Sequence, residues 1–559
     1  MAGHIQRHRY WALGIGLAAA VVTLALQAGG WFDRLEAMSF DARERSTRAH
    51  TSAHPDIALI LIDEASLQAL DPLVGRWPWP RAVFAEAMDF IALGQPKALL
   101  FDVLFTETER GRSGSAGDRR LVQATRDAGV VYHAAHLLRD SADERNKDLL
   151  DRPLPPPFMQ RFAVTAASVA ERNNNYYLPF SGLWQAARGI GVVEFQSDSD
   201  GVYRRTDLLR GYGDRAYPSL ALAAAEAALA PARPEIAGNS IRLAGRHIPL
   251  DADGRYWVHH YGEFKTYSMS GVLASAQSIA RGDVDALLVH PEEFKDKLVF
   301  IGASAAGVED LKATPLGPAT PGVMLHAAIL SNILQHDFLR STPRLVESVA
   351  IALLALFVSG AVILLGRMRH KLFAAAAGLG GYVALAWTAH VADVVLPVVA
   401  PVFAGGLAGL SALAYFALSE GRDKRRVRSM LGQYVSPVVL STVLDRYEDF
   451  LRAEVGSRVR LTIMFADIRG FTALSERLPP EDVVRLLNRY FGAMADAIFA
   501  AQGTLDKFIG DAIMAFWGAP IAQPDHADRA LAAAFDMHRR LDALNAELSI
   551  QGRATLAIG

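Results

Sequence analysis

Four long apolar segments constrain this chain more than any other feature of its sequence. They cover residues 10–31, 345–366, 372–390 and 394–418. Each is close to the ~20 residues that a helix needs to cross the ~30 Å hydrocarbon core of a bilayer. They also explain how a chain that is 51% hydrophobic still carries 21% charged residues. We therefore expect a multi-domain membrane protein with four transmembrane helices in the lipid bilayer.

The first apolar segment has two interpretations, a cleaved signal peptide or a retained membrane anchor. It contains no charged side chain, it is long for a signal peptide, and Gln27-Ala28-Gly29 is a poor cleavage site. We favour the anchor for these reasons.

The positively charged residues beside these segments predict their orientation, because basic loops stay on the cytoplasmic side. Basic residues precede the first segment, separate the second from the third and follow the fourth, whereas the loop after the third has Asp393 and no Lys or Arg. We therefore expect residues 1–9, a linker over 420–455 and a domain over 456–559 to be cytoplasmic. Residues 32–343 then form an external domain.

Composition excludes several classes of function. The chain has 57 Lys and Arg against 59 Asp and Glu, a formal net charge of -2, which argues against a general nucleic-acid binder. It has no cysteine. Disulfides, thiolate zinc sites and cysteine nucleophiles are therefore ruled out.

The external domain alternates strand-like and helical runs, the pattern of an α/β fold. We expect strands over 57–62, 97–105 and 298–302, and helices over 81–93 and 326–334. Asp63 and Asp102 follow or end strands, where a helix cap or a buried hydrogen bond is the favoured interpretation over catalysis. His259 and His260 have too few neighbouring ligands in the sequence for a metal site.

The basic linker over 420–455 has apolar residues at near-helical spacing. Such a helix carries a rotation or register shift inward, or simply packs on its own domain; both interpretations stay open.

The C-terminal segment 456–559 has the order βαββαβ. We expect strands over 458–466, 503–509, 512–517 and 554–558, with helices over 479–501 and 525–548. This is an α+β, ferredoxin-like sheet with both helices on one face.

Two carboxylates in this sheet predict a metal site. Asp467 ends the first strand and Asp511 occupies the hairpin between the second and third strands. Because the first strand lies beside the third in this topology, both carboxylates reach one edge, where hard oxygen ligands suit Mg²⁺ or Mn²⁺. Two such ions, about 3.5–4 Å apart, serve phosphate chemistry. Gly470 lets the backbone approach an anion, and the amides of 468–472 suit phosphate oxygens.

The external segment resembles the class-two CHASE sensor domain. The resemblance rests on "GRWPWPR" at 75–81, "ALLFDVLFTE" at 98–107, "DSDGVYRR" at 198–205, "LVFIGASAAGVEDLKATPLG" at 298–317 and "PGVMLHAAILSNIL" at 321–334. It implies an extracellular or periplasmic sensor of an unknown ligand or stimulus, placed after one membrane helix and before three more.

The C-terminal segment resembles the class III nucleotidyl cyclase catalytic domain of bacterial homodimeric adenylate cyclases. The resemblance rests on "FADIRGFT" at 465–472 and "DKFIGDAIMAFWG" at 506–518. It implies that Asp467 and Asp511 bind two metal ions with help from the Ile468 carbonyl. It also implies that Phe471 and Thr472 lie in the turn that binds the triphosphate of ATP.

By the same resemblance Lys507 recognises the base. An ammonium donates to adenine N1, whereas guanine N1 carries a hydrogen, so Lys507 favours ATP over GTP. The implied reaction converts ATP to 3′,5′-cyclic AMP and pyrophosphate at a site between two subunits, in a bacterial inner membrane protein.

One departure from the family leaves alternatives open. The sequence ends at Gly559, and the family's second base-recognition residue and transition-state Asn and Arg normally lie further along. We therefore expect this chain to be an incomplete cyclase domain with poor catalysis, and a receptor that only binds nucleotide or a partner is an alternative. A guanylate cyclase is disfavoured by Lys507, and a diguanylate cyclase by "FIGDAIM" at the hairpin.

Overall fold

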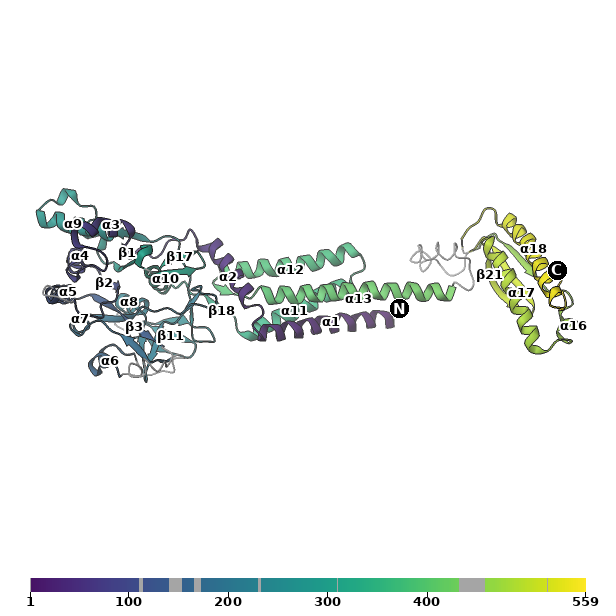
Figure 1. The fold of residues 1–559 in the computed structure, drawn as a ribbon, viewed down its shortest axis with the longest axis horizontal. Coiled ribbons are helices and arrows are strands. Elements are labelled where there is room, and N and C mark those ends of the chain that lie inside the picture. The colour runs from purple at the N-terminus through teal and green to yellow at the C-terminus, as the bar shows by residue number, and fades with distance from the viewer. Residues whose placement is uncertain are drawn as a thin grey trace. The chain divides into compact units, whose positions relative to one another are not determined.

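The computed structural model describes residues 2–109, 114–139, 153–164, 172–229, 233–308, 310–431, 458–519 and 521–559. It divides into two compact units, Met1–Ala412 and Leu413–Gly559, which are described separately (Figure 1).

The first unit is built on a mainly parallel sheet with the order β14-β1-β15-β2-β3, and β6 (parallel) and β5 (antiparallel) both pair with β3. The strands are β1 (Ile57–Ile62), β2 (Ala98–Asp102), β3 (Val131–Leu138), β5 (Asn175–Tyr177), β6 (Gly189–Val192), β14 (Lys265–Ser268) and β15 (Leu298–Ala303). Two smaller sheets have three strands each: β4 (Arg172–Asn173), β8 (Leu209–Tyr212) and β9 (Arg215–Pro218) form one, and β10 (Glu235–Ile236), β11 (Ser240–Leu243) and β12 (Arg246–Pro249) form the other. Two strand pairs complete the unit's described sheets. They are β7 (Arg205–Thr206) with β13 (Tyr256–Trp257), and β16 (Leu311–Thr314) with β17 (Gly317–Pro321).

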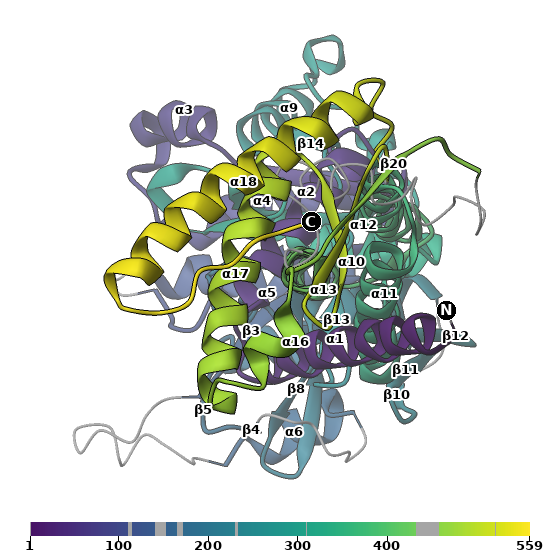
Figure 2. The same cartoon turned by 90° about the vertical axis from the view of Figure 1, so that its right-hand side faces the viewer.

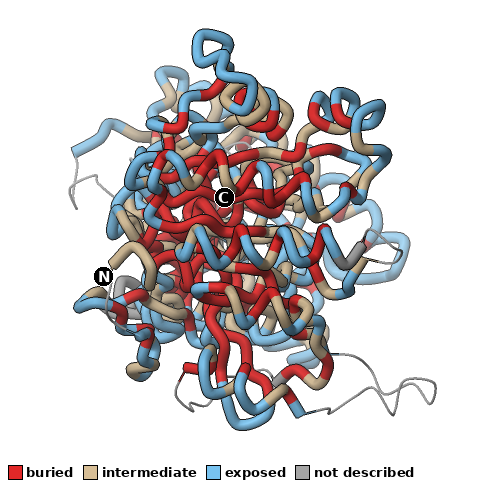
Figure 3. Tube along the Cα trace, turned by 90° about the vertical axis from the view of Figure 1, so that its left-hand side faces the viewer, coloured by how far each residue is buried: buried red, intermediate tan, exposed pale blue. Residues whose placement is uncertain are grey.

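Alternating side chains of β1 enter two separate cores. Ile57 and Leu59 pack with α8 (Leu220–Leu229) and α10 (Gly322–Gln335) on one face of the sheet. Ala58 and Ile60 pack on the other face with α3 (Glu64–Val74), α4 (Arg81–Leu93), α5 (Gly114–Ala128) and α9 (Met269–Arg281). A strand buried on both faces explains the unbroken apolar run of β1. Figure 3 shows these buried central segments surrounded by exposed loops.

Several predicted elements of this unit are confirmed. β1 and α4 have the predicted bounds, and Asp63 caps α3 by accepting a hydrogen bond from the Ser66 backbone N–H at 2.8 Å. The predicted strand over 97–105 is shorter, because its pairing with β15 ends at Asp102. The helix predicted over 326–334 begins earlier, directly after Pro321. The two remaining short helices are α6 (Pro156–Phe162) and α7 (Ser181–Ala186).

Four helices of the described chain are long and apolar enough to cross a membrane. They are α1 (Ala2–Ala28), α11 (Arg344–Leu364), α12 (Met368–Val391) and α13 (Val399–Leu431). The prediction that the last one begins at residue 394 is wrong, because Val394–Val395 form strand β19, which pairs with β18 (Arg340–Ser341). α13 continues into the predicted linker as far as Leu431, and residues 432–457 lie outside the described residues.

Small residues allow close contact between these helices. A side chain at Gly16 of α1 would come within 2.7 Å of Ser359 Oγ on α11, and that hydroxyl donates to the Ala12 carbonyl. A shorter helix, α2 (Asp33–Arg48), follows α1 and contacts α12.

The second unit is a three-stranded antiparallel sheet with the order β20-β22-β21. Its elements are β20 (Thr462–Ala466), α16 (Phe471–Ser475), α17 (Pro480–Ala500), β21 (Thr504–Ile509), β22 (Ala512–Trp517) and α18 (His526–Ile550). α17 and α18 pack together on one face, with a core that contains Tyr490, Met494 and Trp517 (Figure 2).

Two strand predictions in this unit need correction. The first strand begins at Thr462 rather than 458, because its partner β22 ends opposite that residue at Trp517. The predicted fourth strand, 554–558, is represented by a single antiparallel bridge between Ile468 and Ile558. That bridge lies on the free side of β20, where the Gly559 N–H donates to the Asp467 carbonyl at 3.0 Å.

Candidate metal and nucleotide site

The register of the second sheet brings Asp467 and Asp511 to one edge. Ala466, the last residue of β20, faces Ile513 of β22, so the residue that follows it meets the hairpin turn. Gly510 forms that turn with a φ of 66°, a conformation that glycine adopts without strain. The two carboxyl groups lie within hydrogen-bonding reach of each other. The predicted convergence is therefore present in the geometry.

The carboxylate pair lacks a positively charged partner. Burial raises the pKa of Asp511, and the neighbouring Asp467 carboxyl raises it further. No Lys or Arg among the described residues forms an ion pair with either group. Two like charges held together in this way are relieved by a cation, and oxygen ligands select a hard one. The donor set therefore fits Mg²⁺ or Mn²⁺.

Tyr490 of α17 lies beneath this pair and was not found from the sequence. Its side chain is fully buried, and its hydroxyl has no hydrogen-bond partner among the described residues. Burial, with added repulsion from Asp467 and Asp511, raises the pKa of Tyr490 to about 12. The available signal was the helical spacing of Leu486, Tyr490 and Met494, which places the tyrosine on the covered face of α17.

The turn after Asp467 has the expected open backbone. Gly470 has a φ of 68°, and no atom lies within 4 Å of the position that a Cβ would take. Ile468 is buried, and its N–H donates to Asp467 Oδ1 at 3.0 Å. Phe471 is half-buried and Thr472 is exposed at the start of α16.

Lys507 forms an ion pair with its neighbour Asp506. It follows a β-bulge in β21 between Leu505 and Lys507, it is exposed, and its Nζ lies 3.1 Å from Asp506 Oδ2. The described residues include no contact between Lys507 and either Asp467 or Asp511. The bulge, which the sequence analysis did not predict, decides which face of the sheet this side chain takes.

A second cluster of possible metal ligands lies in the first unit. His259, Asp337 and Asp393 point their ligand atoms toward one another. However, Nη2 of Arg48 lies between them, 3.0 Å from His259 Nε2, 2.9 Å from Asp337 Oδ1 and 3.2 Å from Asp393 Oδ1. The guanidinium already supplies the positive charge there, so we assign no metal to this cluster.

Two family descriptions match the chain. The CHASE2 domain matches residues 17–364, more than half of the sequence, and the adenylate and guanylate cyclase catalytic domain matches residues 454–559.

Individual relatives match the second region. Adenylate cyclase 1 of Rhizobium meliloti (strain 1021) is 39% identical over 95 residues, which are 17% of this chain and 14% of the relative. An adenylate cyclase of Anabaena cylindrica is 38% identical over 119 residues, 21% of this chain and 23% of the relative. The chain thus spans less than a quarter of the length of these relatives.

Solved structures match the same region. The guanylyl cyclase Cya2 is 44% identical, with 19% of this chain and 54% of that chain covered and a TM-score of 0.18. The adenylyl cyclase CyaB from P. aeruginosa is 38% identical, with 18% and 54% covered and a TM-score of 0.18. With the sensor match over most of the chain and the cyclase match after it, the chain belongs to the CHASE2 domain family and carries an adenylate and guanylate cyclase catalytic domain.

Proposed function

We propose that this protein is a membrane-bound adenylate cyclase, which converts ATP to 3′,5′-cyclic AMP and pyrophosphate under the control of an external sensor. The observation that carries the proposal is the pair Asp467 and Asp511, two carboxylates held together at a sheet edge without a basic partner. The names of the relatives, which include adenylate cyclases, support the choice of reaction.

Asp467 and Asp511 would hold two divalent cations, Mg²⁺ or Mn²⁺, with the Ile468 carbonyl as a further ligand. When bound, such ions lower the pKa of the ribose 3′-hydroxyl and neutralise phosphate charge. Tyr490 packs in the core of α17 and interacts electrostatically with both carboxylates, so it would limit their movement.

The turn at 468–472 would hold the triphosphate. Gly470 has no side chain to obstruct an approaching phosphate, and the exposed Thr472 offers a hydroxyl and a backbone N–H beside it. Phe471 packs against the domain core and fixes the turn. Donors aimed at the leaving pyrophosphate stabilise the charge that develops in the transition state.

A homodimer would complete the site. The face of the sheet opposite α17 and α18 leaves large apolar side chains exposed: Ile463, Phe465 and Ile509. Such a face favours a second copy of the chain. Lys507 shares this exposed face, because it and Phe465 both pair with Met514, so it would serve the site of the partner subunit.

Lys507 would select ATP, and the alternative is a guanylate cyclase. That alternative has support from the 44% identity to the guanylyl cyclase Cya2 over the matched region. Turnover of ATP and GTP by the protein expressed from its natural reading frame separates the two. We expect ATP preference in the wild type and a loss of that preference in Lys507→Glu. GTP preference in the wild type would overturn the adenylate assignment.

The proposed location is the bacterial inner membrane, which the chain would cross several times. The four apolar helices support membrane insertion, and the basic residues beside them support an external sensor and a cytoplasmic cyclase domain. The division into residues 1–9, 10–31, 32–343, 345–366, 372–390, 420–455 and 456–559 belongs to this proposal, with the last apolar helix beginning at Val399. An unidentified sensor ligand belongs to it as well.

A further inference from the structure

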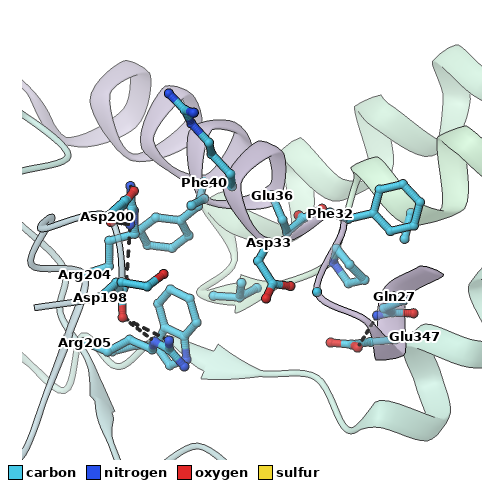
Figure 4. A pocket seen from close by; sticks show the side chains of 18 of the residues that line it. Gln27, Phe32, Asp33, Glu36, Phe40, Asp198, Asp200, Arg204, Arg205 and Glu347 are labelled. Atoms are coloured by element: carbon cyan, nitrogen blue, oxygen red, sulfur yellow. Dashed lines mark hydrogen bonds and ion pairs between the residues drawn. The ribbon is translucent and has the colours of Figure 1, made fainter. Parts of the chain in front are cut away.

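A large cavity adjoins one end of the apolar helices. Its volume is about 1000 Å³, within the range of ligand sites in proteins. Its walls come from the end of α1 and the start of α2, from the starts of α11 and α13, and from the sensor segment that contains Asp198 and Arg204 (Figure 4).

The cavity is held open because α2 is fixed on two sides. Toward the sensor, Asp41 accepts two hydrogen bonds from the Arg204 guanidinium, at 2.6 and 2.7 Å. Toward the apolar helices, Glu36 accepts hydrogen bonds from the N–H groups of Val398 and Val399 at 2.8 Å. α2 therefore cannot move into the cavity without breaking these bonds.

The charged groups on the sensor wall are already paired. Arg204 binds Asp41 and Asp200, and Arg205 binds Asp198 and Asp251. They shape the cavity and have little capacity left for a ligand.

The wall nearest the apolar helices differs from the sensor wall in how its charged groups are paired. The guanidinium groups of Arg34 and Arg344 and the carboxylate of Asp33 are exposed, and they form no hydrogen bond or ion pair within the described chain. Glu347 accepts one hydrogen bond, from the Gln27 amide at 3.2 Å. Two cations and two carboxylates thus face one space, an arrangement that suits a ligand with one anionic and one cationic group.

The position of this wall identifies the source of such a ligand. The apolar stretches of α1, α11 and α13 end or begin at Ala28, Arg344 and Val399, all beside the cavity. Trp31, next to it, is 75% exposed, as is typical of tryptophans at a membrane surface. If these helices span a bilayer, the cavity lies at the level of the lipid headgroups.

We propose that this cavity binds the headgroup of a phospholipid that carries a phosphodiester and a primary ammonium, as in phosphatidylethanolamine. Arg34 and Arg344 hold the phosphate, and Asp33 and Glu347 accept hydrogen bonds from the ammonium. The proposal rests on the membrane location given above. Since α2 joins the sensor to the apolar helices here, the bound lipid becomes part of that junction.

The test uses the full chain in phosphatidylcholine vesicles with or without phosphatidylethanolamine. Native mass spectrometry of the extracted protein then measures retained lipid. We expect wild type to retain phosphatidylethanolamine in preference to phosphatidylcholine, and the double variant Arg34→Gln/Arg344→Gln to retain about tenfold less. The matched control, Arg76→Gln/Arg281→Gln, changes exposed arginines of the sensor outside the cavity and is expected to behave as wild type.

Three outcomes would overturn the proposal: equal retention of both lipids by wild type, unchanged retention by the cavity variant, or loss in the control as well. A fourth arm adds free phosphoethanolamine; retention of that compound without retained lipid would overturn the lipid as the source. Flotation of the same vesicles separates this proposal from the membrane location, because a chain that does not float contradicts the location itself.

Discussion

At the scale of single residues, the molecule places charged side chains where only a partner can stabilise them. Asp467 and Asp511 at the sheet edge have no basic partner. Glu44 in the first unit is fully buried, and it accepts hydrogen bonds from the His260 backbone N–H at 2.8 Å and pairs with His259 and His390 at 3.2 and 3.0 Å. We expect the first arrangement to bind a cation from solution, whereas the second is complete within the chain.

The Asp511 carboxyl predicts how metal affects stability. Its pKa is raised in the folded state, so its contribution to stability is present below the ordinary pKa and lost as pH rises through the raised value. At pH 7 we expect Asp511→Asn to unfold at a higher temperature than wild type in a chelator. Mn²⁺ at about 100 times its Kd is expected to stabilise wild type by about 2.7 kcal/mol and to leave the variant unchanged. Calorimetry measures both, and an equal Mn²⁺ effect on the two proteins would contradict the site.

His259 predicts a second pH dependence, in the sensor. Burial and the nearby Arg48 guanidinium lower its pKa, but interactions with Asp393 and Glu44 outweigh both and raise the pKa to about 9. The stabilising contribution of the protonated ring is therefore complete below about pH 6.5 and is lost as pH rises to 9. We expect the unfolding temperature of the full chain to fall across that interval in wild type and to change less in His259→Gln. Parallel curves for the two proteins would show that His259 is neutral.

The sequence predicts those residues whose position follows from local secondary structure, and it does not predict those whose contacts join distant parts of the chain. Asp467 and Asp511 were found because a strand end and a hairpin have known positions in a βαββαβ sheet. The contacts of Arg48 with Asp337 and Asp393 join residues 289 and 345 positions apart, and no local pattern encodes such pairs. The sequence indicates only that Tyr490 is a core residue, because its proximity to Asp467 and Asp511 depends on the folded structure.

At the scale of elements, the exposed face of the cyclase sheet predicts association. Phe465 is 61% exposed on β20, although the run that contains it is strongly apolar. We expect Phe465→Asp to weaken dimerisation at least ~10-fold, because it replaces apolar contact with a charge. Sedimentation of the full chain checks this, and Mn²⁺ binding should survive because the carboxylates are on the same subunit.

The control for this prediction is Val484→Asp on α17, a similarly exposed apolar position that lies on the helix-covered side. It should leave the dimer intact. Dissociation by both variants, or by neither, would show that the β20 face is not the interface.

Elements were predicted best where one pattern governs them. The bounds of β1, α4 and β22 agree with the sequence, because their apolar patterns end at clear turn or cap residues. The short helix α2 was not predicted, since its charged residues pack against distant segments rather than forming an apolar stripe. The start of α13 was misplaced for a similar reason: β19 pairs with a strand more than fifty residues earlier.

At the scale of the whole molecule, the proposed orientation has a direct test, because the chain has no cysteine. Leu288 in the sensor is 71% exposed. The variant Leu288→Cys is expected to react with a membrane-impermeant maleimide in cells whose outer membrane has been removed and whose inner membrane is intact. A cysteine at Leu531 of α18, 58% exposed, should react only after the cells are opened. The reverse pattern would contradict the orientation.

The central claim is that Asp467 and Asp511 together support cyclisation of ATP, and cyclic AMP formation tests it most directly. The protein expressed from its natural reading frame is assayed with ATP and Mn²⁺ beside Asp467→Asn, Asp511→Asn and the exposed control Asp542→Asn on α18. We predict cyclic AMP from wild type and the control, and at least ~100-fold less from each of the other two variants. Undiminished cyclic AMP formation by Asp467→Asn or Asp511→Asn, or none by wild type, would contradict the account.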